Sequence, residues 1–103
     1  VKNEEPTYYA PGCEVNTSQF ASGSIVEGKV VRSVISRNVQ FHKNSLVKES
    51  IIFPRVVIGE GAQVEYAIID KGAEVAEGVV IRGTAENPVV IKKGEKVTED
   101  ILS

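Results

Sequence analysis

His42 is the only histidine of the sequence, so it is the first residue to consider for acid–base chemistry. A neutral imidazole near neutral pH suits a general base. The residue directly follows Phe41, which the hydrophobic pattern described below places in the core, so its side chain is expected to point outward to solvent. No insertion long enough to build a pocket lies near it. We interpret His42 as a surface residue and predict no catalytic residues in this chain.

Other catalytic constellations are also missing from the sequence. A catalytic zinc site needs about three protein ligands, commonly histidines, and a chain with one histidine cannot build a three-histidine site, so no metal site is predicted. Cys13 has no neighbouring histidine that would activate it as a nucleophile. The serines at repeat positions are explained by their small size: Ser18, Ser33, Ser45 and Ser50. The carboxylates are interpreted as solvated surface residues: Glu60, Glu65, Glu74 and Glu77.

Basic side chains offer a possible binding site. Arg37, Arg55 and Lys71 follow one another at spacings of eighteen and sixteen, close to a repeat of seventeen described below. If successive repeats stack, these residues form a basic column along one edge, which suits a phosphorylated effector. The alternative is ordinary solubilising charge, interleaved with Glu49 and Asp70.

A sequence repeat predicts the short strands that would position these residues. Ser33–Ile35, Ser50–Ile52 and Ala67–Ile69 recur at a constant spacing of seventeen. Within this period, apolar residues occur in steps of five or six, and most are preceded two residues earlier by serine or alanine. The predicted structural core consists of Ile35, Phe41, Val47, Ile52, Ile58, Val64, Ile69, Val75 and Ile81. Steps of five extend the pattern backwards through Val30, Ile25, Phe20 and Val15.

This rhythm predicts an all-β fold, a single-stranded parallel β-helix of the hexapeptide-repeat type with about four to five coils. In a short strand, residues i and i+2 share a face, so the aliphatic residue and its small predecessor both point inward. Three strands and three corners then close one triangular coil. An antiparallel sandwich is the competing fold, but its strands would be longer and spaced by about 8 to 12 residues.

The chain reads as a fragment of a longer protein, because it lacks any methionine and begins in a polar, proline-containing stretch. Residues 1–12 are expected to form an extended lead-in from a missing N-terminal domain, and residues 13–84 the β-helix. A turn-rich segment, residues 82–88, ends at Pro88 and interrupts the repeat. Residues 85–103 are expected to form a terminal partial coil or a hairpin cap.

The charge composition bears on the classes of partner that the chain could bind. The 12 basic and 14 acidic residues nearly balance, which favours neither a nucleic-acid-binding nor a membrane-binding protein. No apolar run is long enough for a membrane span, and no signal peptide is expected. With a single cysteine, the cytoplasm is the expected compartment.

Several segments resemble the C-terminal domain of bacterial glucose-1-phosphate adenylyltransferases, also called ADP-glucose pyrophosphorylases. The resemblance covers nearly the whole chain and lies in Tyr8–Gly12, Ser24–Gly28, Ser33–Arg37, Ser50–Pro54, Ile58–Gly61 and Ala67–Lys71. Gly83–Pro88 and Val97–Ser103 are more similar to the regulatory-type glycogen biosynthesis subunit of Gram-positive bacteria than to the catalytic subunit.

The resemblance implies a left-handed β-helix that is not itself an enzyme. The parent would be a nucleotidyltransferase, or its regulatory subunit, in the reaction of ATP with glucose 1-phosphate to ADP-glucose and pyrophosphate. No cofactor is expected in this chain, since ATP and Mg²⁺ would bind the missing N-terminal domain. Partners would be that domain, the catalytic subunit of a homo- or heterotetramer and a sugar-phosphate effector.

One effector-binding residue is carried over by the resemblance. Lys71 matches the basic residue of the family's Ile-Asp-basic turn, which contacts effectors. Enterobacterial relatives have arginines after a Val-Thr pair, whereas Thr98 here is followed by Glu99–Ser103 without a cation, which implies altered regulation. The alternative function is a trimeric hexapeptide-repeat acyltransferase domain of another nucleotide-sugar enzyme, which would bind acetyl-CoA.

Overall fold

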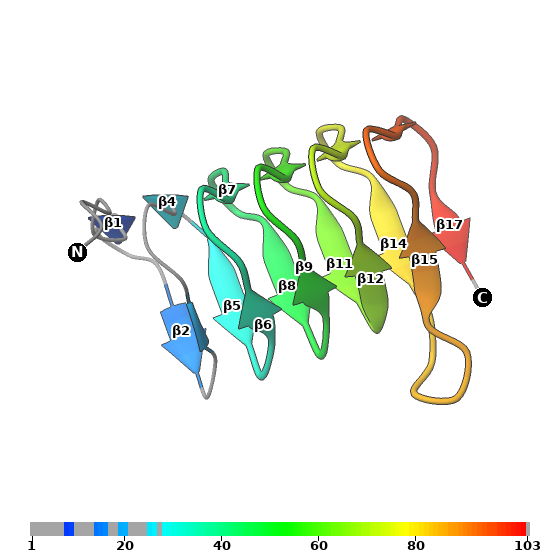
Figure 1. The fold of residues 1–103 in the computed structure, drawn as a ribbon, viewed down its shortest axis with the longest axis horizontal. Coiled ribbons are helices and arrows are strands. Elements are labelled where there is room, and N and C mark those ends of the chain that lie inside the picture. The colour runs from blue at the N-terminus through cyan, green and yellow to red at the C-terminus, as the bar shows by residue number, and fades with distance from the viewer. Residues whose placement is uncertain (1–7, 10–13, 17–18, 21–24, 27, 103) are drawn as a thin grey trace.

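The computed structural model describes residues 8–9, 14–16, 19–20, 25–26 and 28–102. Its strands form three parallel sheets that the chain visits in turn, so that each coil adds one short strand to each sheet (Figure 1). The result is an all-β parallel solenoid of the hexapeptide-repeat type with about four turns, as the sequence predicts.

We name the sheets A, B and C. Sheet A contains β1 (Tyr8–Tyr9), β4 (Ile25–Val26), β7 (Gln40–Phe41), β10 (Val57–Ile58), β13 (Glu74–Val75) and β16 (Lys96–Val97). Sheet B contains β2 (Glu14–Asn16), β5 (Lys29–Val31), β8 (Leu46–Lys48), β11 (Gln63–Glu65), β14 (Val80–Arg82) and β17 (Ile101–Leu102). Sheet C contains β3 (Gln19–Phe20), β6 (Val34–Ile35), β9 (Ile51–Ile52), β12 (Ala67–Ile69) and β15 (Val89–Ile91).

The interior is a stack of aliphatic side chains. In sheet C, Ile35 pairs with Ile52 and Ile52 with Ile69, so the spacing of seventeen seen in the sequence is the length of one coil. The nine residues that the repeat assigns to the core are at most 2% exposed: Ile35, Phe41, Val47, Ile52, Ile58, Val64, Ile69, Val75 and Ile81. Val30, Ile91 and Val97 continue the same buried rows towards the two ends of the solenoid.

The register of the first coil differs from the five-residue steps expected for it. Val26, and not Ile25, pairs with Phe41, whereas Val15 pairs with Val30 and Phe20 with Ile35 as expected. The steps from Phe20 through Val26 and Val30 to Ile35 are therefore six, four and five. The connection before β4 is one residue longer than expected, and the connection after it is one residue shorter.

Two buried serines connect successive coils where sheet B turns into sheet C. The Ser33 hydroxyl donates to the Val31 carbonyl and accepts from the Ser50 N–H, with separations of 2.8 and 3.1 Å. The Ser50 hydroxyl does the same with the Lys48 carbonyl and the Ala67 N–H, at 2.8 and 3.2 Å. These serines therefore satisfy buried backbone groups in addition to being small.

We predict that Ser50→Ala lowers the free energy of unfolding by about 1–3 kcal/mol, because the Ala67 N–H and the Lys48 carbonyl both lose a partner. Chemical denaturation followed by circular dichroism measures the change. Thr98→Ala is the control, since Thr98 is exposed and surface substitutions usually stay within about 0.5 kcal/mol. Equal stabilities of the two variants would contradict this role for the Ser50 hydroxyl.

The corners use left-handed backbone conformations. Where sheet C turns into sheet A, which we call the C–A corner, Asn38, Arg55, Gly72 and Gly94 have φ between 59° and 73°. The matching position of the B–C corner carries Arg32, Glu49 and Tyr66, also at positive φ. Such angles are uncommon outside glycine, so sequence alone does not locate these corner residues.

The last coil contains an excursion. Ile91 pairs with Ile69 but follows it by twenty-two positions rather than seventeen, so residues 83–88 lengthen this coil by five. Thr84 closes the loop, because its hydroxyl accepts the Asn87 N–H at 3.0 Å. Beyond it, β15, β16 and β17 each pair in parallel with the preceding strand of their sheet. Figure 1 shows the loop extending from the side of the solenoid between β14 and β15.

Candidate functional site

His42 lies at the corner between sheets A and B. Its side chain is half-buried, and its backbone carbonyl accepts both the N–H and the hydroxyl of Ser45, at 3.2 and 2.7 Å. Ser45 is 1% exposed and its hydroxyl already donates, which leaves it unsuited to nucleophilic attack. These contacts give the His42 backbone a structural role at this corner.

The carboxylates named in the sequence analysis are spread over the surface. Glu60 and Glu77 occupy equivalent positions of successive A–B corners, and Glu74 lies on the outward face of sheet A. Glu65 lies 3.7 Å from the Arg82 Nε across sheet B. Among the residues that the structure describes, no three histidine, cysteine or acidic side chains come together in an arrangement able to hold a metal ion.

Arg37, Arg55 and Lys71 gather on successive coils of the C–A corner. The Arg55 N–H donates to the Arg37 carbonyl at 3.2 Å, and the Gly72 N–H to the Pro54 carbonyl at 3.0 Å. Arg37 and Lys71 therefore share one column, two coils apart, with Pro54 between them, and Arg55 stands in the adjacent column. Each of these three coils presents one of the exposed cations at the corner, staggered by one residue at Arg55.

A fourth cation joins this corner. The Gly94 N–H donates to the Lys71 carbonyl at 3.0 Å, which places the exposed Lys93 directly after Lys71 in the column. The repeat of seventeen did not reveal Lys93, because the excursion of the last coil shifts its position by five. We call Arg37, Arg55, Lys71 and Lys93 the cationic ridge.

The acidic residues beside the ridge are occupied by backbone amides. The Asp70 carboxylate accepts the Lys71 N–H at 2.7 Å, and the Glu95 carboxylate accepts the Lys92 N–H at 3.0 Å. Within the described part of the chain, none of the four ridge side chains forms an ion pair with a carboxylate. Their charges therefore remain open to an external anion.

The B–C corner differs in this respect. Arg32 pairs with Glu49 of the next coil, and Arg82 lies close to Glu65 of the preceding one. Each of these arginines has its carboxylate one coil away, so both positive charges on that edge are paired with a negative one. The two corners have similar backbone conformations but opposite electrostatic character.

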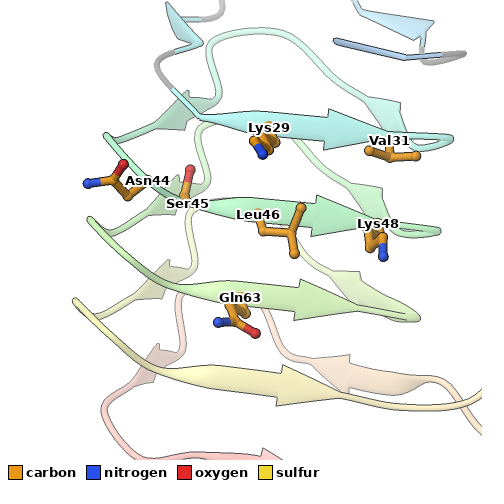
Figure 2. A pocket seen from close by; sticks show the side chains of 7 residues that line it. All are labelled: Lys29, Val31, Asn44, Ser45, Leu46, Lys48 and Gln63. Atoms are coloured by element: carbon orange, nitrogen blue, oxygen red, sulfur yellow. The ribbon is translucent and has the colours of Figure 1, made fainter. Parts of the chain in front are cut away.

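A second candidate is a shallow concavity of about 530 Å³ on the outward face of sheet B. Figure 2 shows Lys29, Leu46 and Gln63 on three successive strands, with Val31 and Lys48 further along theirs. Asn44 lies at one end, and the buried Ser45 completes the lining. No histidine, cysteine or carboxylate is among the described residues that line this concavity, so it offers polar contacts but no general base or activated nucleophile.

One protein-family model covers most of the chain. The model of the GlmU-like, C-terminal hexapeptide family matches residues 9–100. No helix among the described residues is long and apolar enough to cross a membrane.

Curated relatives include enzymes of several bacilli. Glucose-1-phosphate adenylyltransferases of Bacillus thuringiensis and Bacillus anthracis are each 30% identical over 95 residues, which is 90% of this chain. The chain is homologous to the C-terminal region of these enzymes and spans 25% of their length.

Solved structures share the fold. WeeI from Acinetobacter baumannii superposes with a TM-score of 0.75 at 20% identity, covering 88% of this chain and 49% of WeeI. PerB from Caulobacter crescentus, solved in complex with CoA and GDP-perosamine, gives 0.52 at 13% identity, covering 94% of this chain and 48% of PerB. At these identities the likeness concerns the fold alone.

Proposed function

We propose that this chain, which belongs to the GlmU-like, C-terminal hexapeptide family, is a non-catalytic oligomerisation and allosteric domain of a glucose-1-phosphate adenylyltransferase subunit. In this proposal it serves glycogen biosynthesis in the cytoplasm. The observation that carries the proposal is the homology to the C-terminal region of the Bacillus enzymes over 90% of the chain.

The proposal assigns catalysis and regulation to different domains, as the resemblance to the adenylyltransferases implies. ATP, Mg²⁺ and glucose 1-phosphate would bind a nucleotide-binding domain outside this chain, while the solenoid contacts that domain and other subunits of a tetramer. The similarity of Gly83–Pro88 and Val97–Ser103 to the regulatory-type subunit supports that version of the proposal.

Two measurements test this assignment. The first is the coding DNA upstream of Val1, which is expected to encode a nucleotide-binding domain. An intact Gly-rich loop with acidic metal ligands there would indicate a catalytic subunit, and their replacement a regulatory one. An open reading frame that begins just before Val1 would overturn both versions.

The second measurement addresses the alternative, a trimeric acyltransferase domain of another nucleotide-sugar enzyme. Titration of the chain with acetyl-CoA in a calorimeter is expected to give no saturable heat, because the concavity on sheet B is shallow and its described lining holds no general base. Saturable binding of acetyl-CoA would replace our proposal by the acyltransferase.

We further propose that the cationic ridge holds the effector, a sugar phosphate. Arg55→Glu and Lys71→Glu are each expected to weaken binding of glucose 1,6-bisphosphate at least about tenfold, since an ionic hydrogen bond contributes roughly 1.5–3 kcal/mol. Isothermal titration calorimetry measures the affinity. Lys43→Glu, an exposed cation at the A–B corner, is the matched control. An unchanged affinity of both ridge variants would refute the site.

A further inference from the structure

The outward face of sheet C is unusually apolar. Val34, Ile51, Ile68 and Val90 pair in register across four neighbouring strands, so their side chains form one row, which we call the apolar column. Val34, Ile51 and Val90 are 48%, 43% and 63% exposed. At the parallel-strand spacing of about 4.8 Å, the row is roughly 14 Å long.

The equivalent row of sheet A is mostly polar. It consists of Gln40, Val57, Glu74 and Lys96. An uninterrupted aliphatic row on one outward face is therefore not required by the solenoid itself. Ile68, the fourth member, is half-buried, and a row of this kind is a candidate interaction surface.

The apolar column borders the cationic ridge. Along one coil the chain passes from Ile51 in the column to Phe53, which is 38% exposed, and then to Arg55 in the ridge. On the next coil the chain passes from Ile68 in the column to Asp70, whose carboxylate accepts the Lys71 N–H, and then to Lys71 in the ridge. Sheet C and the C–A corner thus present an apolar strip with a parallel line of positive charge on one side. Figure 1 shows β6, β9, β12 and β15, which carry the column, side by side along the solenoid.

We propose that this surface binds an acidic amphipathic helix of a partner protein, lying along the solenoid axis. A helix advances about 5.4 Å per turn, close to the rise of about 4.8 Å per coil, so an apolar stripe at i, i+3 and i+7 follows the column. Carboxylates on the flank of that helix, repeating at i and i+4, face the ridge cations. The inference rests on the proposed function and deepens it, because partner and effector draw on the same ridge charges.

A second copy of this chain is a poorer occupant. If two copies pack through sheet C about a two-fold axis parallel to the solenoid, the ridge of one copy faces the B–C corner of the other. The carboxylates there, Glu49 and Glu65, already lie beside arginines. A two-fold axis across the solenoid brings ridge against ridge. Neither arrangement neutralises the four cations.

An anionic membrane is also disfavoured. The chain carries a formal net charge of −2, so attraction by the ridge is opposed by the rest of the molecule. The aliphatic row is half-exposed, and the aromatic side chain described beside it, Phe53, is 38% exposed and is neither of the residue types, tryptophan and tyrosine, that anchor proteins at lipid headgroups.

The test uses a fluorescein-labelled helical peptide of about 18 residues with leucines in one stripe and glutamates on one flank, titrated with the chain by fluorescence anisotropy. Saturable binding on the order of 100 µM or tighter is expected. Ile51→Lys and Arg55→Glu are each expected to weaken it at least about tenfold, by loss of apolar contact and by charge reversal. Leu102→Lys and Lys43→Glu are the matched controls, exposed residues of the same kinds on other faces, expected to bind like the unaltered chain. Circular dichroism verifies that all variants fold.

The outcomes separate the possible occupants. No saturable binding, or equal binding of a peptide with lysine in place of glutamate, would overturn the proposal. So would binding to phosphatidylcholine–phosphatidylserine vesicles without binding to the peptide, or self-association that Ile51→Lys abolishes. Ile51→Lys leaves the ridge charges intact, so it should not weaken binding of glucose 1,6-bisphosphate. Failure of helix binding is thereby distinguishable from failure of the effector site.

Discussion

Ile58→Asp is expected to leave the chain unfolded at room temperature. Ile58 is fully buried, and it pairs with Phe41 on one side and Val75 on the other, in the middle of sheet A. An aspartate there would be a charge without a partner in the aliphatic stack, or a neutral acid that still lacks hydrogen-bond partners. Losses above roughly 4–5 kcal/mol are exceptional for one substitution, and they approach the total stability of a small domain.

Circular dichroism during heating tests this expectation, because a folded solenoid gives a cooperative transition and the variant should give none. Val57→Lys is the matched control. Val57 precedes Ile58, faces outward and pairs with Glu74, so a lysine there gains a carboxylate neighbour. Lys71→Glu, on the exposed ridge, should also fold normally. A normal transition for Ile58→Asp would refute the assignment of inward and outward positions.

The fold was predictable because its core obeys a short, regular spacing. A strand of two or three residues has only one or two inward positions, so a shift by a single residue would expose the whole row. Ile35, Ile52 and Ile69 therefore recur at a spacing of seventeen, and the sequence displays the coil length directly.

The structure differs from the prediction at the corners, where the chain can turn with connections of different length and conformation. Val26, and not the expected Ile25, pairs with Phe41. Ile25 and Val26 are both aliphatic, so the sequence does not show which of the two takes the core position. Arg55 adopts a φ of 63°, a conformation that no property of arginine signals. The position of Lys93 does not follow from the spacing of seventeen, because the excursion at residues 83–88 displaces the next coil by five residues.

The surface was harder to predict than the core. The spacing of Arg37, Arg55 and Lys71 indicated a shared edge, but whether their charges were neutralised depended on the directions of the Asp70 and Glu95 side chains. The apolar column was visible only as the middle residues of the recurring triplets. Its exposure follows from the strand pairing, which places Val34, Ile51, Ile68 and Val90 on one outward face.

Gly59→Ala is expected to destabilise the solenoid by about 3 kcal/mol or more, the upper end of the range for overpacking. Gly59 is buried, and its N–H donates to the Val75 carbonyl of the next coil at 2.8 Å. A Cβ at this position would lie 2.7 Å from the Val75 oxygen, 2.8 Å from the Glu77 nitrogen and 2.9 Å from the Ala76 carbonyl carbon. All three atoms belong to the backbone of the neighbouring coil, so no side-chain rotation relieves the contact.

Thermal unfolding measures the effect, with an expected fall in Tm of roughly 12 °C or more for a domain of this size. Gly78 provides the control for backbone conformation without crowding, because its φ is +70° and a Cβ there would meet no atom within 4 Å. Gly78→Ala should cost only about 1–2 kcal/mol, the penalty of the left-handed conformation. Gly78→Asn should cost less, since Asn44 occupies the equivalent corner two coils earlier at a φ of 62°. If Gly59→Ala cost no more than Gly78→Ala, conformational freedom rather than close approach between coils would explain the glycine at position 59.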